Sequence, residues 1–509
     1  MTKLPHADGR DQDAALAVLD KDVRSGKAKR VDTHISIVFL EPDRVLKIKR
    51  AVRLPFLDYS TLDKRRAACE AELAVNRRFA PDIYRGVVPI TSGAGGPEIG
   101  GNGPVIEWAV EMARFDEGKT FDHLARAGAL KPDLADAMAD MMRQAHTRAE
   151  VSDGTSWLTS LALFIDRNTE KFRGQTSLSR EEVEQLHRSS HQRLAAVRPL
   201  LQARAAAGTV CRCHGDAHLG NIVLIGDKPV LFDAIEFDPV IATTDILYDL
   251  AFPLMDLVHF GLCAAANRLL NRYLQAGWNE NAGALALLPL FLSIRAAIRA
   301  HVLFTRCEQS PEDVRDAREA KSYFDLALQV LEPARPSLIA IGGKSGTGKS
   351  LLARDVAPLP KPLPGAVILR SDVIRKELYG VDPLVALPEA AYAEEVTARV
   401  YRTLNERARE VISQGFSAII DAAFLREAER DALAAGARTM AADFRPIFLD
   451  ADFSVRVSRI ASRRRDASDA TAEIASRQES YDIGRLDWPV VDASSSPEQT
   501  REKSLTLLG

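Results

Sequence analysis

Cysteine is scarce in this sequence. Five occur among 509 residues, and no two of them have the spacing CxxC. An odd and scattered set argues against a disulfide framework and fits a reducing compartment, so we expect a cytoplasmic protein. Cys211, Cys213 and His214 stand close together, but no second ligand pair follows at zinc spacing. We therefore interpret Cys211 and Cys213 as buried strand residues that lead into a loop.

The sequence also lacks a large excess of charge of one sign, and it lacks long apolar runs. The formal net charge is −3, so no excess charge draws the whole chain to nucleic acid or to an anionic membrane. The first twenty residues lack the apolar centre of a signal peptide. The most apolar run, residues 282–294, is short, contains Pro289 and is followed by Arg295. We expect neither a signal peptide, nor a membrane span, nor a nucleic-acid partner.

The length and the local patterns predict more than one domain, because a domain holds about 150 residues. Pro333 and Pro336 follow an apparent helix end and precede a strand-like run, which places a boundary there. The expected parts are an N-terminal extension (1–30), a first domain (31–332, with a small lobe about 31–115 and a helical lobe about 116–332) and a second domain (337–509).

Apolar runs in these two domains predict different sheets. HISIVFL, RVLKIK and PVIEWAVEM are the expected strands of the small lobe. SLIAIGG, GAVILR, SAIID, FRPIFLD and PVVDA alternate with helical segments in the second domain, as in a parallel sheet covered on both faces. We expect residues 1–15, the loop 93–103 and the tail after Asp492 to be loosely held.

The stretch GGKSGTGKS at 342–350 contains the pattern G-x-x-x-x-G-K-[ST] between a strand and a helix. Glycines allow backbone N–H groups to surround phosphate oxygens, a lysine bridges phosphates, and a serine hydroxyl can ligate Mg²⁺. The predicted nucleotide-binding residues are Gly343, Gly346, Gly348, Lys349 and Ser350, with Ser350 also a metal ligand.

Two carboxylates and an arginine-rich stretch accompany this loop. Asp372, after the strand AVILR, could orient or deprotonate an acceptor hydroxyl, cap its own helix, or do both. Asp421, at the end of SAIID, could hold the water shell of Mg²⁺. The stretch 457–478 could be a solvated basic face or a lid that neutralises phosphoryl charge, and we favour the lid.

This part of the chain, about 336–495, resembles the small P-loop kinases that phosphorylate metabolites, such as gluconate kinase, and the related zeta-toxin type that phosphorylates a nucleotide sugar. The resemblance implies ATP-dependent transfer to a small hydroxyl compound. It also implies that Asp372 is the base or the acceptor-orienting group, and that Arg459 or Arg463 is a lid arginine.

A second phosphoryl-transfer pattern, CHGDAHLGNIVL, lies far upstream at 213–224. Asp216 and Asn221 have the spacing D-x-x-x-x-N, and Asp233 follows at the end of the strand PVLF. A hairpin of this length lets Asn221 and Asp233 share Mg²⁺ while Asp216 accepts a proton from the substrate. A turn rich in Asp and Asn would explain any one of these residues but hardly the whole set.

A site of this kind needs a cation on the nucleotide phosphates, held by a helix carboxylate. Lys47 and Lys49 share one face of the strand RVLKIK, and the following helix offers Glu70 and Glu72. We choose Lys47 with Glu72, although either neighbour could replace its partner. This choice gives the face of Glu72 an apolar stripe. The stripe consists of Val75 and Phe79.

The strand PVIEWAVEMARF would then connect the two lobes, with the backbone from Glu111 to Ala113 available to the adenine edge. No glycine-rich phosphate loop is evident around THISIVFLEPDR, so the backbone of residues 33–36 is the expected phosphate cover.

Residues 31–330 resemble the aminoglycoside phosphotransferase family of small-molecule kinases, whose loop likewise reads HGD followed by Asn, with a later metal-binding Asp. The resemblance implies that Asp245 and Asp249 are structural and bond the catalytic loop. Together the two parts look like bacterial fusions of aminoglycoside phosphotransferase-like and ATP-binding domains.

The predicted fold class is therefore α/β multidomain, with a bilobal protein-kinase-like α+β domain followed by a P-loop parallel-sheet domain. The leading hypothesis is a bifunctional kinase with two sites for ATP and Mg²⁺ that act on a sugar, an amino sugar or a related hydroxyl compound. In one alternative, one domain binds nucleotide and regulates the other. In another, the C-terminal domain is a zeta-toxin-like nucleotide-sugar kinase.

Overall fold

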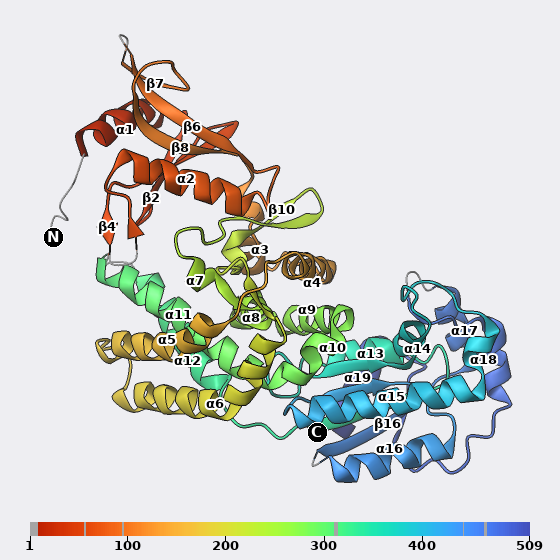
Figure 1. Ribbon diagram of the computed structural model, residues 1–509. Coiled ribbons are helices and arrows are strands. Elements are labelled where there is room, and N and C mark those ends of the chain that lie inside the picture. The colour runs from red at the N-terminus through yellow and green to blue at the C-terminus, as the bar shows by residue number, and fades with distance from the viewer. Residues whose placement is uncertain are drawn as a thin grey trace. The chain divides into compact units, whose positions relative to one another are not determined.

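The computed structural model describes residues 9–54, 57–93, 96–309, 314–440, 442–462 and 466–508 (Figure 1). The chain divides into two compact units. The first contains Met1–Leu161 and Leu201–Asp256, and the second contains Ala162–Leu200 and Leu257–Gly509. Three helices continue from one unit into the other, so the units do not follow the order of the chain. These helices are α5 (Thr155–Arg173), α6 (Arg180–Ala206) and α8 (Ile246–His259).

The first unit begins with a six-stranded antiparallel sheet of order β1-β2-β3-β8-β6-β7. Alternate side chains of a strand point to opposite faces, so one face packs against α1 and the other against α2. The elements are α1 (Gly9–Arg24), β1 (Lys29–Asp32), β2 (Ser36–Leu40), β3 (Arg44–Lys49), the short pair β4 (Arg53–Leu54) and β5 (Leu57–Asp58), α2 (Leu62–Asn76), β6 (Tyr84–Gly93), β7 (Gly96–Ile99) and β8 (Val105–Ala113).

The three strands predicted for this lobe are present as β2, β3 and β8, but the sheet is larger than the sequence indicated. The glycine-rich segment expected to be a mobile loop contributes β7, which pairs with the end of β6. The N-terminal segment expected to be loose, residues 1–15, includes the first part of α1, and Ala15 in it and Leu19 one turn later are buried against the sheet. Residues 1–8 lie outside the described residues. Both segments are ordered by contacts with the sheet, through strand pairing in one case and burial in the other. Local composition indicates neither kind of contact.

The rest of the first unit carries the segment that contains CHGDAHLGN. The strand β9 pairs with β12, and β10 and β11 form the expected hairpin after Asn221. The elements not yet named are η1 (Glu117–Lys119), α3 (Phe121–Arg126), α4 (Pro132–Thr147), β9 (Val210–Arg212), η2 (Leu219–Asn221), β10 (Ile222–Ile225), β11 (Lys228–Leu231), α7 (Pro239–Ala242) and β12 (Thr243–Asp245).

The second unit contains a helical part and a parallel sheet. Its helical part holds Trp278–Glu308, a stretch that by length and composition alone could cross a membrane. Most of the apolar window of this stretch, 83%, is buried inside the protein, as in the core helix of a soluble protein. The elements are α9 (Cys263–Ala276), α10 (Trp278–Asn281), η3 (Ala282–Leu287), α11 (Leu288–Gln309) and α12 (Val314–Gln329).

All five strands predicted for the second domain are present and parallel, in the order β14-β15-β13-β16-β17. The tail expected to be loose forms α19, whose Leu508 is buried in the core with α13. The elements are β13 (Ser337–Gly343), α13 (Lys349–Val356), β14 (Val367–Arg370), α14 (Ser371–Leu378), η4 (Glu389–Tyr392), α15 (Glu394–Ser413), β15 (Ala418–Asp421), α16 (Glu427–Thr439), β16 (Asp443–Asp450), α17 (Phe453–Ala461), α18 (Ala472–Glu479), β17 (Val490–Asp492) and α19 (Pro497–Leu508).

The helix α9 closes the edge of this parallel sheet at β14. The side-chain oxygen of Asn271 accepts a hydrogen bond from the Ile368 N–H at 2.7 Å, and its amide donates to the Ala366 carbonyl at 3.1 Å. The buried amide of Asn267 donates to the same carbonyl at 3.0 Å. An edge strand otherwise leaves a row of backbone groups without partners. The helical part and the sheet are therefore bonded to each other within one unit.

We expect Asn271→Ala to lower the free energy of unfolding by about 1–3 kcal/mol, because the Ile368 N–H loses its partner, while the Ala366 carbonyl keeps the hydrogen bond from Asn267. Urea unfolding of the full chain measures this. The exposed Asn279, on the neighbouring α10, provides the control, and Asn279→Ala should change stability by less than about 0.5 kcal/mol. Equal effects of the two substitutions would contradict the role given to Asn271.

Candidate active sites

The loop after β9 brings Asp216 and Asn221 together. The amide nitrogen of Asn221 donates to the Asp216 carboxylate at 3.1 Å and to the Asp216 carbonyl at 2.9 Å. Asn221 is buried, while the side chain of Asp216 is 38% exposed. These bonds use the amide nitrogen of Asn221 and leave its amide oxygen as an acceptor, and the Asp216 carboxylate is partly accessible.

His214 and Gly215 fix this loop from within. The buried His214 bonds through Nε2 to the Phe232 carbonyl at 3.0 Å, and burial lowers the pKa of its imidazole, so the ring stays neutral. Gly215 has φ +85°, and a Cβ there would lie 3.0 Å from Ala242. Only glycine suits that position. The Cys213 thiol bonds to the Thr244 carbonyl, and both cysteines are buried as expected, but only Cys211 lies in the strand β9, and Cys213 is the first residue after it.

Carboxylates on α8 hold the loop from outside. Asp249 accepts a hydrogen bond from the Gly215 N–H at 2.9 Å, as the sequence led us to expect. Asp245 was expected to do the same, but it lies in β12 and instead pairs with Arg204 at 2.6 Å. Asp256, which the sequence did not single out, accepts the Leu219 N–H at 2.9 Å. The spacing of Asp249 and Asp256, two helical turns apart, is the signal that could have found it.

Five charged side chains form one network, in which Lys49, Glu72 and Glu236 are buried, Lys47 is mostly buried and Asp233 is 43% exposed. Lys47 Nζ lies 2.9 Å from a Glu72 oxygen and 2.6 Å from an Asp233 oxygen. Lys49 Nζ lies 2.6 Å from the other Glu72 oxygen and also pairs with Glu236. The predicted pair of Lys47 and Glu72 is therefore formed. The second lysine joins the same glutamate rather than replacing the first.

The charges of this network set its ionisation. Burial opposes the charged form of Lys47, but Asp233 and Glu72 outweigh it and raise its pKa well above the ordinary value. Burial likewise opposes the charge of Asp233, yet Lys47 lowers the pKa of that carboxyl. Burial raises the pKa of Glu236. Three carboxylates face two ammonium groups, so the ionised network has an excess of negative charge that a further cation would neutralise.

The face of α2 differs from the predicted one. Glu70 is about half exposed and pairs with Arg66, so it takes no part in the network. Val75 and Phe79, expected to form a buried stripe beside Glu72, are only partly buried. The buried face of α2 is mostly polar, since its ion pairs and hydrogen bonds replace apolar packing. It consists of Arg65, Cys69, Glu72 and Asn76.

The predicted adenine contact lies inside the sheet. Glu111 and Ala113 belong to β8 and are in register with Leu46 and Arg44 of β3. The Ala113 N–H also donates to the Ile83 carbonyl at 2.7 Å. The first backbone beyond the sheet is that of residues 114–116. In the turn between β1 and β2, the expected phosphate cover, Thr33 and Ser36 bond to each other.

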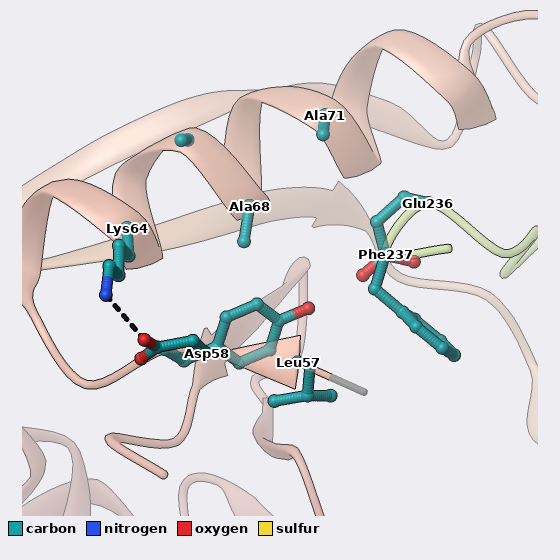
Figure 2. Close-up of a pocket in the computed structure, with 9 residues that line it drawn as sticks. Leu57, Asp58, Lys64, Ala68, Ala71, Glu236 and Phe237 are labelled. Carbon is teal, nitrogen blue, oxygen red and sulfur yellow. Dashed lines mark hydrogen bonds and ion pairs between the residues drawn. The ribbon is translucent and has the colours of Figure 1, made fainter. Parts of the chain in front are cut away.

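A pocket of about 300 Å³ lies against the outer side of α2 (Figure 2). Lys64 and Asp58 are joined at one end, and Glu236 and Phe237 stand at the other. Tyr59 also lines it, and burial raises the pKa of this phenol to about 12. The pocket borders the charged network at Glu236 but not the loop 213–221, and none of the site residues predicted from the sequence lines it.

In the second unit, the loop after β13 has the backbone that glycine permits. Gly346 has φ +89°, and a Cβ there would lie 2.6 Å from the Arg456 carbonyl oxygen. Gly348 has φ +95° at the start of α13. Lys349 Nζ donates to the Gly343 carbonyl at 2.8 Å and to the Lys344 carbonyl at 3.0 Å. The predicted phosphate-binding residues thus form one loop at the end of the first strand.

The next two strand ends supply the other predicted residues. The Ser350 hydroxyl donates to the Asp421 carboxylate at 2.5 Å, which joins the two predicted metal ligands. Arg370 donates to Ser350 at 3.0 Å and contacts Asp421 at 3.3 Å. Arg370 was not identified from the sequence, although its position at the end of β14, in register with Asp421, could have indicated it.

Asp372 lies in the first turn of α14 but does not cap it. The capping position is Arg370, and no side-chain capping hydrogen bond is present there. Burial raises the pKa of Asp372, and Arg370 opposes this rise. Of the two interpretations given to Asp372, capping is not realised in this structure, and a carboxyl of raised pKa beside the phosphate-binding loop remains.

We expect Asp372→Asn to raise the free energy of unfolding of the ligand-free protein at neutral pH by about 0.5–2 kcal/mol. A carboxyl of raised pKa binds its proton more tightly in the folded chain than in the unfolded one. Its contribution to stability therefore falls as pH rises from the ordinary aspartate value through the raised one. Urea unfolding at several pH values measures the difference.

The exposed Asp431 on α16 provides the control, since Asp431→Asn should change stability by less than about 0.5 kcal/mol at any of these pH values. A loss of stability in Asp372→Asn at neutral pH would contradict the interpretation.

A second cavity, of about 260 Å³, adjoins the phosphate-binding loop. Gly346, Gly348 and Arg459 border it, together with Pro497 at the start of α19. The Arg459 guanidinium donates to the carbonyls of Ala493 at 2.8 Å and Ser495 at 2.7 Å. Arg459 thus borders this cavity, and its role as a lid arginine stays a prediction. Arg463 lies outside the described residues.

Two known families match successive parts of the chain. Residues 42–284 match the family described as "Phosphotransferase enzyme family", and residues 338–481 match the family described as "AAA domain". Uncharacterized proteins of Mycobacterium tuberculosis and Mycobacterium bovis are 28% identical over 477 residues, and these matches cover 90% of this chain and 91% of each relative.

Solved structures resemble each part separately. A choline/ethanolamine kinase family protein from Mesorhizobium loti is 13% identical with a TM-score of 0.36, and the match covers 63% of this chain and 99% of that protein. A gluconokinase from Sinorhizobium meliloti 1021 is 20% identical with a TM-score of 0.26, and the match covers 34% of this chain and 93% of that protein.

Proposed function

Because the chain is a fusion of an aminoglycoside phosphotransferase-like kinase domain with a P-loop kinase domain, we propose that it transfers phosphoryl groups from ATP to hydroxyl groups of small molecules at two sites. The observation that carries the proposal is the grouping within one unit of Asp216 with Asn221, and of Lys47 with Glu72 and Asp233. These are the residue types that phosphoryl transfer requires.

At the first site, the residues fit Mg²⁺ and nucleotide phosphates. The Asn221 amide oxygen and the Asp233 carboxylate are oxygen donors of the kind that Mg²⁺ prefers, and they flank the open end of one hairpin. Bound Mg²⁺ would neutralise phosphate charge. Glu72 holds the Lys47 ammonium charged and oriented for a phosphate oxygen. The accessible Asp216 carboxylate orients the acceptor hydroxyl and accepts its proton.

At the second site, Ser350 and Asp421 are the residues that would hold Mg²⁺, directly or through water. The backbone N–H groups of residues 343–350 and the Lys349 ammonium would bind the phosphates. The cavity beside Gly348 and Arg459 is the place for the nucleoside. Asp372, with its raised pKa, is suited to take the proton of an acceptor hydroxyl.

A second candidate function is regulation of one site by the other. The contact of Asn267 and Asn271 with the β14 edge favours it, because that strand leads directly into Arg370 and Asp372. Under this alternative only one of the two sites transfers phosphate, and nucleotide at the other changes its rate.

The test is transfer from γ-labelled ATP to a panel of sugars, amino sugars, nucleosides and aminoglycosides. Wild type, Asp216→Asn and Lys349→Ala are compared. If both sites transfer phosphoryl groups, each variant should lose a different labelled product. Loss of one and the same product in both variants would support regulation. Absence of any labelled acceptor in the presence of ATP and Mg²⁺ would count against the small-molecule proposal.

A further inference from the structure

Two histidines on α6 and an aspartate on α5 lie close together, and neither candidate active site includes them. His187 and His191 are on α6, and Asp166 is on α5. One ligand atom from each of the three lies within 4.8 Å of the others, and the two imidazole rings are 4.6 Å apart. We propose that these three side chains bind a divalent transition-metal ion.

The helix geometry fixes the positions of the three residues. Residues four apart lie on the same helix face, so both imidazoles of α6 point toward α5. Three contacts follow one another along the two antiparallel helices. They join Arg173 to Glu184, Thr169 to His187, and Asp166 to His191. The cluster is therefore part of a regular packed pair of helices, and its backbone positions are set before any ion binds.

The separations of the ligand atoms suit one ion. Two ligands of a tetrahedral zinc ion, each bonded at about 2.0–2.1 Å, lie about 3.3 Å apart. His191 Nε2 is 2.8 Å from the Asp166 carboxylate, and His187 Nδ1 is 3.9 Å from it. These two separations would each have to change by about half an ångström, which a small side-chain rotation supplies, and all three ligand atoms lie within 4.8 Å of one another.

The chemistry of the donors selects the class of ion. Imidazole nitrogens favour zinc, copper, nickel or cobalt, whereas Mg²⁺ and Ca²⁺ prefer oxygen donors. Binding would replace the hydrogen bond from His191 to Asp166 and the long contact of 3.3 Å between His187 and the Thr169 hydroxyl. Each neutral imidazole keeps its one proton on the other ring nitrogen.

The ion can reach the cluster, since the side chains are 30%, 34% and 54% exposed for His187, His191 and Asp166. This exposure also leaves room for a water molecule as a fourth ligand. The buried group of His146, Cys213 and Asp249 is also compact, but Asp249 is already bonded to the catalytic loop. The cluster of α5 and α6 is therefore the better site for an exchangeable ion.

The experiment is equilibrium binding of Zn²⁺ to the full chain, prepared without a polyhistidine tag and with Mg²⁺ in excess to occupy the carboxylate sites. Wild type should bind one Zn²⁺ more than the double variant His187→Ala/His191→Ala. Each single variant should weaken this binding at least about 100-fold, since loss of an outer partner alone costs 10–100-fold. Asp166→Asn should weaken it as well, although an amide can still accept the His191 hydrogen bond.

The matched control is His123→Ala. His123 is exposed and lies beside Asp122, but no second histidine follows one turn later on α3. This variant should bind as much Zn²⁺ as wild type. All variants should unfold at the wild-type temperature in a chelator, which shows that the cluster is not needed for folding. Equal Zn²⁺ binding by wild type and the double variant would overturn the proposal.

Discussion

Replacement of Asp216 by Asn should lower the rate of phosphoryl transfer at the first site by about 10²–10⁴-fold, the usual contribution of a general base. Asn keeps the size of the side chain and can still accept the hydrogen bond from Asn221, so the loop should keep its shape. Binding of ATP should change little, because the Lys47 and Glu72 pair and Asp233 are untouched. Single-turnover kinetics with the acceptor identified by the labelling panel measures the rate.

The matched control is Asp227→Asn in the turn between β10 and β11. Asp227 is exposed and belongs to the hairpin that follows Asn221. Its substitution should leave the rate within about twofold of wild type, as expected of a surface change far from the reacting atoms. An Asp216→Asn enzyme that retains the wild-type rate would remove Asp216 from the mechanism and with it the assigned role of the loop.

Replacement of Lys349 by Ala should lower transfer at the second site by about 10²–10³-fold, as when one preorganised donor to developing charge is removed. The ammonium lies against the carbonyls of the loop that it would leave to reach phosphate. Nucleotide binding in the second unit should weaken with it, while the product formed at the first site persists. Isothermal titration with a non-hydrolysable ATP analogue follows the binding.

Lys344 provides the comparison within the same loop. Its ammonium lies 3.0 Å from Glu479 rather than along the loop, so Lys344→Ala should affect transfer far less than Lys349→Ala. Similar losses in both variants would mean that the loop binds phosphate by overall positive charge. In that case the specific position of Lys349 would carry no special role.

The parallel sheet could be predicted from the sequence almost completely, because strands buried on both faces are continuous apolar runs between glycines and prolines. The small-lobe sheet could be predicted only in part. β1 is mostly exposed and charged, β6 has an irregular register, and β7 is rich in glycine and proline, so none of these strands has the alternating pattern of a half-buried strand. Their pairing depends on partners that are distant in the sequence.

Among the candidate site residues too, those in a local sequence pattern could be predicted and those defined by distant contacts could not. Asp216, Asn221 and the loop 343–350 could be identified because a motif is a local pattern. Glu236 could not, since it acts through a contact with Lys49, 187 positions away. Arg370 and Asp256 left only weak signals, their positions at the end of β14 and two helical turns after Asp249, and many surface-like charges compete for such roles. Likewise, Lys49 is buried because it pairs with Glu72 and Glu236, and the sequence of its own strand does not indicate this burial.

If one chain carries two nucleotide sites, it should bind two molecules of an ATP analogue in the presence of Mg²⁺. Equilibrium dialysis of the full chain should give two for wild type and one for Lys349→Ala. A value of one for wild type that Lys349→Ala reduces to zero would show that only the second unit binds nucleotide, and would contradict the claim.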